Sequence, residues 1–356
     1  MFKYIGSKRK FVPTLGTLAR NSESQTAVDL FTGTTRVAQE FKRSGLLTTA
    51  ADLATYSHVL AQTYIETDAE SVDASELESA LLYLNDLPGK PGYFTETFCV
   101  KSRFFQPHNG ERVDAIREAI ESDFTDSSLY PLLLTSLLQA ADKVDSTTGL
   151  QMAFLKDWAP RSYNKLELKI PTLLPGTGVA LLGDAMDLIK EIPPTDLLYL
   201  DPPYNQHRYF TNYHIWETLV RWDKPEAYGV AQKRVDARDS ATKSVFNSKP
   251  KMKDAFFQLL NDARARIVLI SYNNESWISA AQMMEHLRAI GHDRVVKLAF
   301  EHDRYVGARI GIHNPKGQKV GRVSHTTNTE WIFVAGDLDD VERTIRGLDE
   351  HVVASQ

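Results

Sequence analysis

Five short, largely apolar runs recur along the chain. Runs of this kind are typical of strands that are buried on both faces of a sheet. The predicted strands are Thr26–Phe31, Thr49–Leu53, Gly178–Ala185, Leu197–Leu200 and Ala265–Asn273. Two later runs, Val295–Glu301 and Thr329–Val334, indicate a final hairpin. The pattern predicts an α/β fold built on an open sheet.

Between the second and third of these strands, apolar residues recur with the period of a helix. We expect helices near residues 54–68, 75–84, 112–121 and 130–143. Turn residues interrupt them at Pro88–Gly92 and Pro107–Gly110. This segment is too long for a simple crossover, so we expect residues 55–175 to form a helical insertion. Residues 1–54 and 176–356 would form the core domain.

The strand Leu197–Leu200 is followed directly by Asp201-Pro202-Pro203-Tyr204. The two prolines end strand pairing. Ligands of open α/β sheets bind outside the carboxyl ends of the strands, so a carboxylate, a rigid turn and an aromatic ring are expected there together. The alternative is an ordinary Pro-Pro turn in which Asp201 acts as a local cap.

Residues 201–204 resemble the catalytic motif of amino-methyltransferases that act on the exocyclic nitrogen of adenine. That nitrogen is a poor nucleophile because its lone pair is delocalised into the ring. Asp201 and the carbonyl of Pro202 can accept its two hydrogens and stabilise the positive charge that develops during attack. Tyr204 can stack on a base that has left the duplex. Asp201, Pro202, Pro203 and Tyr204 are therefore the predicted catalytic residues.

A turn of small residues, Thr32–Thr35, joins the first strand to a helix that continues through Phe41. Such a turn lets a ligand approach the backbone. Asp29, Phe31 and Gly33 resemble the Asp-x-Phe-x-Gly motif of S-adenosylmethionine (AdoMet) sites, in which Asp29 can lie near the cationic methionine end. The chain departs from the usual glycine-rich form, because Thr34 or Thr35 stands where a second glycine is expected.

Two further acids end strands. Asp52, with Leu53, follows the second strand, where an acid commonly bonds ribose hydroxyls. Its alternative is a helix cap for Tyr56–Thr67, and both roles are compatible. Asp184 can bond the adenine amino group of the cofactor or cap the helix Met186–Glu191, and the residues themselves do not decide between the two roles.

The N-terminal segment Tyr4-Ile5-Gly6-Ser7-Lys8-Arg9-Lys10 is a frayed basic end or a loop that faces an anion or DNA. It resembles the Gly-x-x-Lys cofactor motif of Dam-type enzymes, the D12 class. The resemblance adds Tyr4, Gly6, Ser7 and Lys8 to the expected cofactor site, which also includes Asp201.

From Tyr4 to about Val334, the order of motifs resembles the D12-class (Dam-like, alpha-group) adenine-N6 DNA methyltransferases. This resemblance implies a Rossmann-like, mixed seven-stranded sheet with a terminal antiparallel hairpin. It also implies AdoMet as cofactor, double-stranded DNA as substrate, and target recognition by the helical insertion, residues 55–175. Residues 1–54 and 176–356 then form the AdoMet-binding catalytic domain. Asp184 is assigned to the cofactor on the same ground.

Basic residues are expected to contact DNA, although the chain carries 41 Lys+Arg against 46 Asp+Glu, a net charge of −5. The span from Tyr228 to Lys253 is locally basic, so its cations are either a solvated loop or phosphate contacts. A Gly-rich link, Arg304–Gly317, could line the base pocket or be a plain hairpin loop. The expected DNA-binding residues are Lys8, Arg9, Lys143, Arg161, Arg208, Lys249, Lys251 and Lys253.

Composition argues against disulfide-bonded, metal-binding and membrane-spanning classes of protein. The single Cys99 excludes an internal disulfide, and the irregular histidines predict no metal site. We expect no signal peptide or membrane span and a cytoplasmic location. Cytosine-N4 methylation and, in another class, a non-catalytic DNA-binding protein of the same fold are the alternatives. The sequence does not reveal the recognised bases, the oligomeric state or a companion restriction endonuclease.

Overall fold

The computed structural model describes residues 3–6, 8–203, 208–239, 242–303, 327–348 and 353–354. Its centre is one sheet with the strand order β10-β8-β9-β7-β4-β1-β2-β3. The strands are β1 (Thr26–Asp29), β2 (Leu47–Asp52), β3 (Val179–Leu182), β4 (Thr195–Leu200), β7 (Ala265–Asn273), β8 (Arg294–Asp303), β9 (Thr327–Gly336) and the two-residue β10 (Val353–Ala354).

Five neighbouring strands of the sheet, in the order β7-β4-β1-β2-β3, are parallel. Beside β7, β9 and β8 form an antiparallel hairpin. Seven longer strands thus form the mixed sheet with a terminal hairpin that the resemblance implied, and this expectation is confirmed. The short β10 extends the sheet to eight strands by pairing with β8.

Alternation along each strand divides the core between the two faces of the sheet. Leu197 and Tyr199 of β4 pack with α1 (Val12–Asn21), α2 (Arg36–Arg43) and α14 (Leu338–Thr344). Leu198 and Leu200 pack on the other face, with α8 (Ala185–Glu191), α11 (Lys249–Asp262) and α12 (Ala280–Ala289). Because both faces are covered, the central strands are almost continuously apolar, which is the pattern from which they were predicted.

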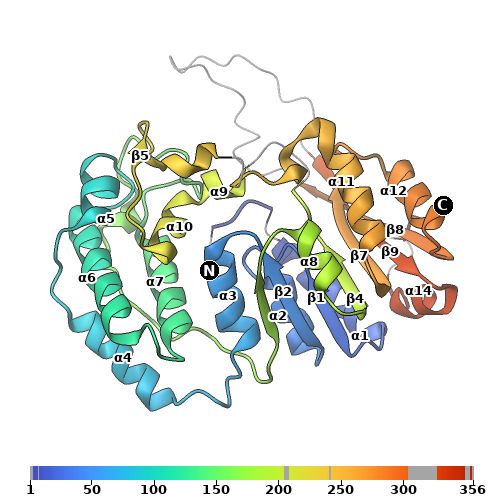
Figure 1. Ribbon diagram of the computed structural model, residues 1–356, viewed down its shortest axis with the longest axis horizontal. Helices are drawn as coiled ribbons and strands as arrows, with labels where there is room; N and C mark the ends of the chain where they lie inside the picture. Colours follow the sequence, from blue (N-terminus) through green and yellow to red (C-terminus); the bar gives the residue numbers. More distant parts are fainter. Residues whose placement is uncertain are drawn as a thin grey trace.

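A helical lobe lies beside the β3 edge of the sheet (Figure 1). It contains α3 (Thr55–Ala61), the π-helix η2 (Gln62–Glu66), α4 (Ala74–Asp86), α5 (Tyr93–Thr95), the π-helix η3 (Glu96–Val100), α6 (Pro107–Phe124), α7 (Tyr130–Val144) and η4 (Pro160–Tyr163). The four predicted helices are confirmed. The turn predicted at Pro107–Gly110 is wrong, because these residues form the first turn of α6, where a proline at the first position is well tolerated.

The lobe also takes in residues that come after the catalytic motif. These are α9 (Tyr209–Asn212), α10 (His214–Arg221) and the hairpin of β5 (Ala227–Tyr228) and β6 (Lys233–Arg234). Tyr213, Trp216 and Leu219 belong to the same apolar core as the insertion helices. The buried Arg117 of α6 ties the two parts together by donating to the carbonyls of Leu219 and Val220 at 2.8 and 3.0 Å. Of the helices among the described residues, none is long and apolar enough to cross a membrane.

Candidate active site

The predicted site residues meet where the strand order changes direction. β1 pairs with β2 on one side and with β4 on the other, and chain connections leave in opposite directions from this point. Asp184, Asp52, Asp29 and Asp201 therefore stand at or just beyond the carboxyl ends of four adjacent strands. In open α/β sheets this edge is where ligands bind.

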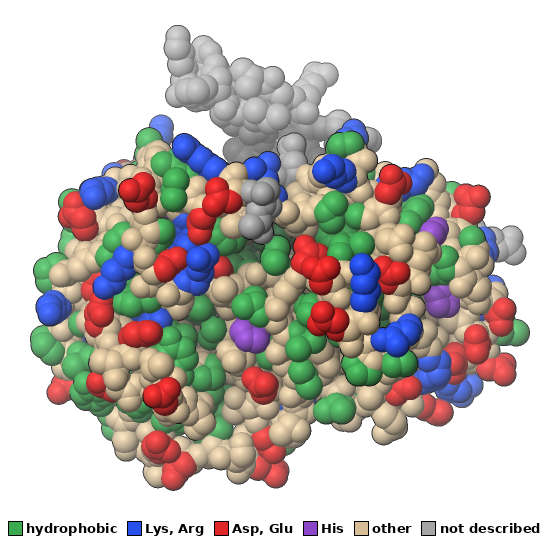
Figure 2. Space-filling model, in the orientation of Figure 1, with side chains coloured by type: hydrophobic (Ala, Val, Ile, Leu, Met, Phe, Trp, Pro, Cys, Tyr) green, Lys and Arg blue, Asp and Glu red, His purple; other side chains and the backbone are tan. Residues whose placement is uncertain are grey.

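A cavity of about 280 Å³ lies over this edge, near the lower end of the size range of small-molecule sites, about 300–1,000 Å³. Figure 2 shows the same face hollowed between the helical lobe and the sheet, with charged side chains of both signs around the hollow. The predicted residues that line the cavity are Tyr4, Gly6, Phe31, Gly33, Asp52, Leu53, Asp184, Asp201, Pro203 and Arg208. Ser7, Tyr204 and the link Arg304–Gly317 lie outside the described residues.

Asp201 forms an ion pair with Lys8, whose Nζ lies 3.1 Å from Oδ1 of Asp201. The same ammonium lies 3.4 Å from Glu330 on β9. Burial raises the pKa of Asp201 to about 6; the charge of Lys8 opposes this rise and that of Glu330 adds to it. Lys8 is itself buried, in the short helix η1 (Lys8–Lys10). It was expected to contact cofactor or DNA, and the structure shows it beside the predicted catalytic carboxylate.

Asp29 lies beneath the turn that follows β1. Its Oδ2 accepts hydrogen bonds from Thr32 Oγ1 at 3.0 Å and from the backbone N–H of Ala38 at 3.2 Å. Its Oδ1 is buried and has no hydrogen-bond partner among the described residues. Burial, helped by the charges of Asp201 and Asp52, raises the pKa of Asp29 to about 7. A buried acceptor without a partner is costly, so this oxygen is suited to a cationic or hydrogen-bonding ligand.

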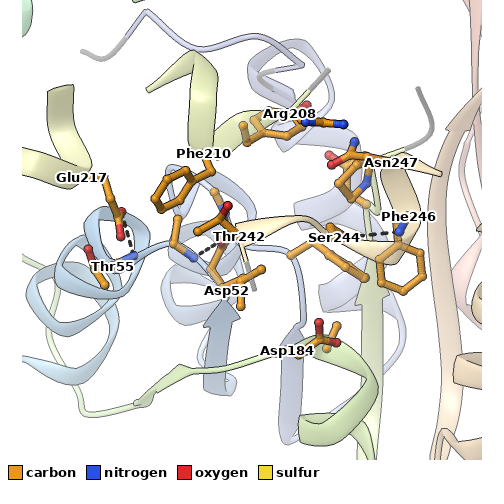
Figure 3. A pocket seen from close by; sticks show the side chains of 18 of the residues that line it. Asp52, Thr55, Asp184, Arg208, Phe210, Glu217, Thr242, Ser244, Phe246 and Asn247 are labelled. Atoms are coloured by element: carbon orange, nitrogen blue, oxygen red, sulfur yellow. Dashed lines mark hydrogen bonds between the residues drawn. The ribbon is translucent and has the colours of Figure 1, made fainter. Parts of the chain in front are cut away.

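Asp52 holds two backbone segments at once. Its carboxylate accepts from the N–H of Gly33 at 2.8 Å and from that of Ala54 at 3.0 Å. Burial raises the pKa of Asp52, although these backbone hydrogen bonds oppose the rise. A different residue caps α3, because Glu217 of α10 accepts from the N–H of Thr55 at 3.1 Å. In Figure 3 Glu217 lies to the left of Asp52, and a dashed line marks its hydrogen bond with Thr55.

Asp184 both caps a helix and faces the cavity. It is the N-cap of α8, and its Oδ1 accepts from the N–H of Met186 at 2.8 Å. The same side chain lines the cavity, below the segment that carries Ser244 and Phe246 (Figure 3). The two roles considered from the sequence are therefore compatible.

The turn between β1 and α2 is tight at two positions. Gly33 has a φ of +50°, and a Cβ there would lie 3.1 Å from the Tyr4 ring. Thr35, one of the two threonines that stand where a second glycine is expected, has a φ of +61°. A left-handed conformation is strained for a β-branched residue. Thr35 is held by two contacts of its hydroxyl, which donates to the carbonyl of Thr34 at 2.7 Å and accepts from Gln39 at 2.8 Å.

A row of stacked rings ends at the cavity, which Tyr4 and Tyr209 line. Tyr4 stacks on Tyr213 with a centroid distance of 4.6 Å, and Tyr213 stacks on Trp216 at 4.7 Å. Tyr4 also stacks on Tyr209, with a centroid distance of 5.4 Å. The backbone N–H of Ile5 donates to the Tyr213 hydroxyl at 2.7 Å, which fixes the N-terminal segment against the helical lobe. This segment therefore bridges the lobe and the catalytic edge of the sheet.

The predicted DNA-binding residues fall in several places. Arg9, Lys143, Arg208, Lys249 and Lys251 are exposed, and Lys253 lies over the ring of Phe257 at 5.6 Å. Arg161 is engaged internally, because its guanidinium contacts Asp145 at 2.7 Å and the carbonyl of Thr147 at 2.5 Å. Their contact with DNA stays a prediction.

Several lining residues were not predicted. Glu217 and Arg221 come from α10, and Thr242, Ser244, Phe246 and Asn247 come from the segment before α11. Phe246 is buried and packs edge-to-face on Phe31 at 5.2 Å. No local motif distinguishes these residues, and Glu330 reaches the site only through the pairing of β9 with β7. Only the folded sheet brings them together.

Comparison with known proteins agrees with this geometry. The chain matches the family model described as D12 class N6 adenine-specific DNA methyltransferase over residues 4–285. It is 32% identical to the type II methyltransferase M.NlaIII of Neisseria lactamica over 83% of this chain and 91% of that protein. It is 30% identical to the modification methylase StsI of Streptococcus sanguinis over 83% of this chain but 47% of that protein. The type II methyltransferase M.CviAII of Paramecium bursaria Chlorella virus 1 is 29% identical, with 82% and 90% covered.

Proposed function

The chain belongs to the D12 class of N6 adenine-specific DNA methyltransferases, and from this premise we propose that AdoMet and a flipped-out adenine meet at Asp201. The enzyme methylates adenine in DNA at specific sites. The observation that carries the proposal is the row of acids at the ends of adjacent strands: Asp184, Asp52 and Asp201 line one cavity, and the buried Asp29 ends the strand between those of Asp52 and Asp201.

The described residues fit AdoMet by charge and by position. AdoMet has a sulfonium and an ammonium group, and the unpartnered Oδ1 of Asp29 offers a buried acceptor for such a cation. We expect Asp52 to bind the ribose hydroxyls and Asp184 the adenine amino group, with Leu53 and Phe31, which also line the cavity, as apolar walls. When bound, AdoMet supplies an electrophilic methyl group.

Asp201 and the Pro202 carbonyl would act on the target adenine. The carboxylate accepts one hydrogen of the exocyclic amine, and the carbonyl accepts the other. The positive charge that develops on the nitrogen is then stabilised by acceptors already in position, the arrangement that is most effective in a site shielded from water. Tyr204 would stack on the flipped base.

Lys8 would keep Asp201 in its charged form and in position. Burial alone favours the neutral acid, which offers a weaker acceptor to the amine. The ammonium of Lys8, at 3.1 Å, offsets part of this effect and restricts the carboxylate to one orientation. Lys8 is therefore a positioning residue for Asp201.

The helical insertion would supply target recognition, with the segment from Lys143 to Arg161 nearest to that role. The names of the relatives describe modification methylases. On this ground we expect the enzyme to serve in a restriction-modification system.

Sequencing of single DNA molecules from cells that express the protein tests this function. Wild type should leave N6-methyladenine at one short sequence, and Asp201→Ala should leave none while still binding AdoMet. Loss of one such electrostatic partner typically costs about 10²–10³ in rate. N4-methylcytosine in place of N6-methyladenine, or near-normal turnover by Asp201→Ala, would contradict the proposed chemistry.

A further inference from the structure

A second hollow adjoins the cavity on the side of the helical lobe. Arg208 lines both. The other side chains that matter in the second hollow are Asn212 of α9, Tyr228 and Lys233 of the β5–β6 hairpin, and Arg238 and Lys243 beyond it. None of its lining residues is acidic. We call this site the basic hollow.

The four cations of the basic hollow are not neutralised within the described part of the chain, where none of them makes an ion pair with a carboxylate. Tyr228 brings two of them together, because the guanidinium of Arg238 lies 3.8 Å from its ring centroid and the ammonium of Lys233 lies 5.9 Å away. Cation–π contacts hold positive charge in place without cancelling it.

Arg234, in the same hairpin, is by contrast a cation that is neutralised within the protein. The buried Arg234 is bonded to Asp223 at 2.6 Å and to Asp236 at 2.7 Å. Asp236 and Asp223 also pair with Arg221, at 3.2 and 3.1 Å. Asp223 and Asp236 are thus used to fix Arg234 and Arg221, and the cations of the basic hollow remain available for a ligand.

Asn212 provides independent evidence for a ligand. It is 5% exposed and lines the hollow, and its Nδ2 is buried without a hydrogen-bond partner among the described residues. A buried donor without a partner costs about 1–3 kcal/mol. Four cations around such a donor form a site for an anion with several acceptor oxygens.

We propose that the basic hollow binds one backbone phosphate of the DNA strand that carries the target adenine. The inference rests on the proposed function, because it assumes that this strand enters the cavity at Asp201. Arg208 lines both spaces, so a phosphate in the hollow would adjoin the flipped nucleotide rather than a distant part of the duplex. The phosphate would hold the distorted backbone while the base occupies the cavity.

Neutral phosphates test the proposal directly. Once the methylated sequence is known, a series of duplexes carries a single methylphosphonate at each position around the target adenine. For wild type we expect kcat/KM to fall about ten- to hundredfold at one position beside the adenine, the range expected for loss of one charge-assisted bond. In Arg238→Gln/Lys243→Gln the same methylphosphonate should lower kcat/KM by less than about threefold, because the cations that would bind the phosphate are already absent.

Asn212→Asp gives a second variant of unchanged shape, in which a negative charge replaces the donor. It too should lose the penalty at that position. Lys190→Gln/Arg288→Gln is the matched control, which removes two exposed cations in the last turns of α8 and α12, outside the hollow, and should keep the full penalty. Melting temperature and AdoMet binding establish that each variant is folded.

The outcomes separate the inference from the function on which it rests. If wild type methylates DNA but the hollow variants keep the full penalty, or no single position is sensitive, the basic hollow does not bind this phosphate. If wild type methylates no DNA, the proposed function itself fails.

Discussion

At the scale of single residues, Lys8 lies between two carboxylates. It contacts Asp201 at 3.1 Å and Glu330 at 3.4 Å. The lysine lowers the pKa of Asp201, whereas Glu330 raises it, and with burial the result is a pKa of about 6. The proposed methyl transfer uses the ionised carboxylate as acceptor, so we expect activity to fall as the pH drops through about 6.

Two neutral variants should move this pH dependence in opposite directions. Lys8→Gln removes the charge that lowers the pKa of Asp201, so the acidic limb of the kcat profile should move to higher pH. Glu330→Gln removes a charge that raises it, so the limb should move to lower pH. The measurement is kcat between about pH 5 and 9 at saturating AdoMet and DNA. Shifts of the same sign in both variants would contradict the assignment of the limb to Asp201.

Thr35 gives a prediction about backbone strain. Its φ of +61° disfavours every side chain with a Cβ, by about 1–2 kcal/mol. Thr35→Gly and Thr35→Ala lose the same hydroxyl contacts, but only glycine relieves the strain. Denaturant unfolding should show Thr35→Gly to be about 1 kcal/mol more stable than Thr35→Ala. The opposite order, which is normal inside a helix, would show that the turn is not strained at this residue.

The sequence predicted those site residues that follow strands. Asp201, Asp52 and Asp184 could be found because each ends an apolar run, and the carboxyl ends of parallel strands share one edge. Glu330 could not be found, since it lies within a strand of ordinary composition. Its approach to Lys8 depends on long-range pairing between β9 and β7, which no local pattern records.

At the scale of elements, α8 begins at a residue that serves two purposes. Asp184 caps the helix through Oδ1 and also faces the cavity. Asparagine caps a helix about as well as aspartate does. Its second group is an amide donor, which would oppose the amino group of the cofactor instead of accepting from it. Substitution can therefore separate the cap from the proposed cofactor contact.

We predict that Asp184→Asn keeps the stability of wild type but binds AdoMet about tenfold more weakly. Asp184→Ala should lose the same affinity and, in addition, about 1 kcal/mol of stability through the missing cap. Calorimetric titration with AdoMet and thermal unfolding measure the two effects. Unchanged affinity in Asp184→Asn would leave the helix cap as the whole role of Asp184.

Elements themselves were predicted best where periodicity was long. The insertion helices and the strand Ala265–Asn273 follow from their apolar patterns. The turn predicted at Pro107 failed because a proline both interrupts a helix and begins one. It was harder still to predict which elements belong to the lobe. The packing of α10 with the insertion depends on contacts such as those of Arg117 with α10, which join residues about a hundred positions apart in sequence.

At the scale of the whole molecule, charge must be judged by position rather than by sum. The net charge is −5, yet many of the acids are used internally, either at the strand ends of the cavity or in pairs such as Asp223 and Asp236 with Arg234. Exposed cations remain beside the cavity and at the start of α11. An acidic protein can therefore present a locally basic surface to DNA.

The start of α11 is the clearest place to test this distribution with salt. Lys249, Lys251 and Lys253 occupy its first turns, where positive charge opposes the helix dipole, so their presence there is not explained by helix stability. The helical period puts Lys249 and Lys253 on one side of α11 and Lys251 on nearly the opposite side.

If the side with Lys249 and Lys253 faces the DNA backbone, Lys249→Gln/Lys253→Gln should make the slope of log affinity against log salt concentration less negative by about 1.8, which is 0.9 for each phosphate. Lys251→Gln, the control, should leave the slope near that of wild type. The affinity of the double variant should fall equally for matched and scrambled duplexes, because phosphate contacts position the protein and do not read sequence. A changed methylation site in the double variant would show instead that α11 reads bases, and an unchanged slope would exclude this face from the DNA interface.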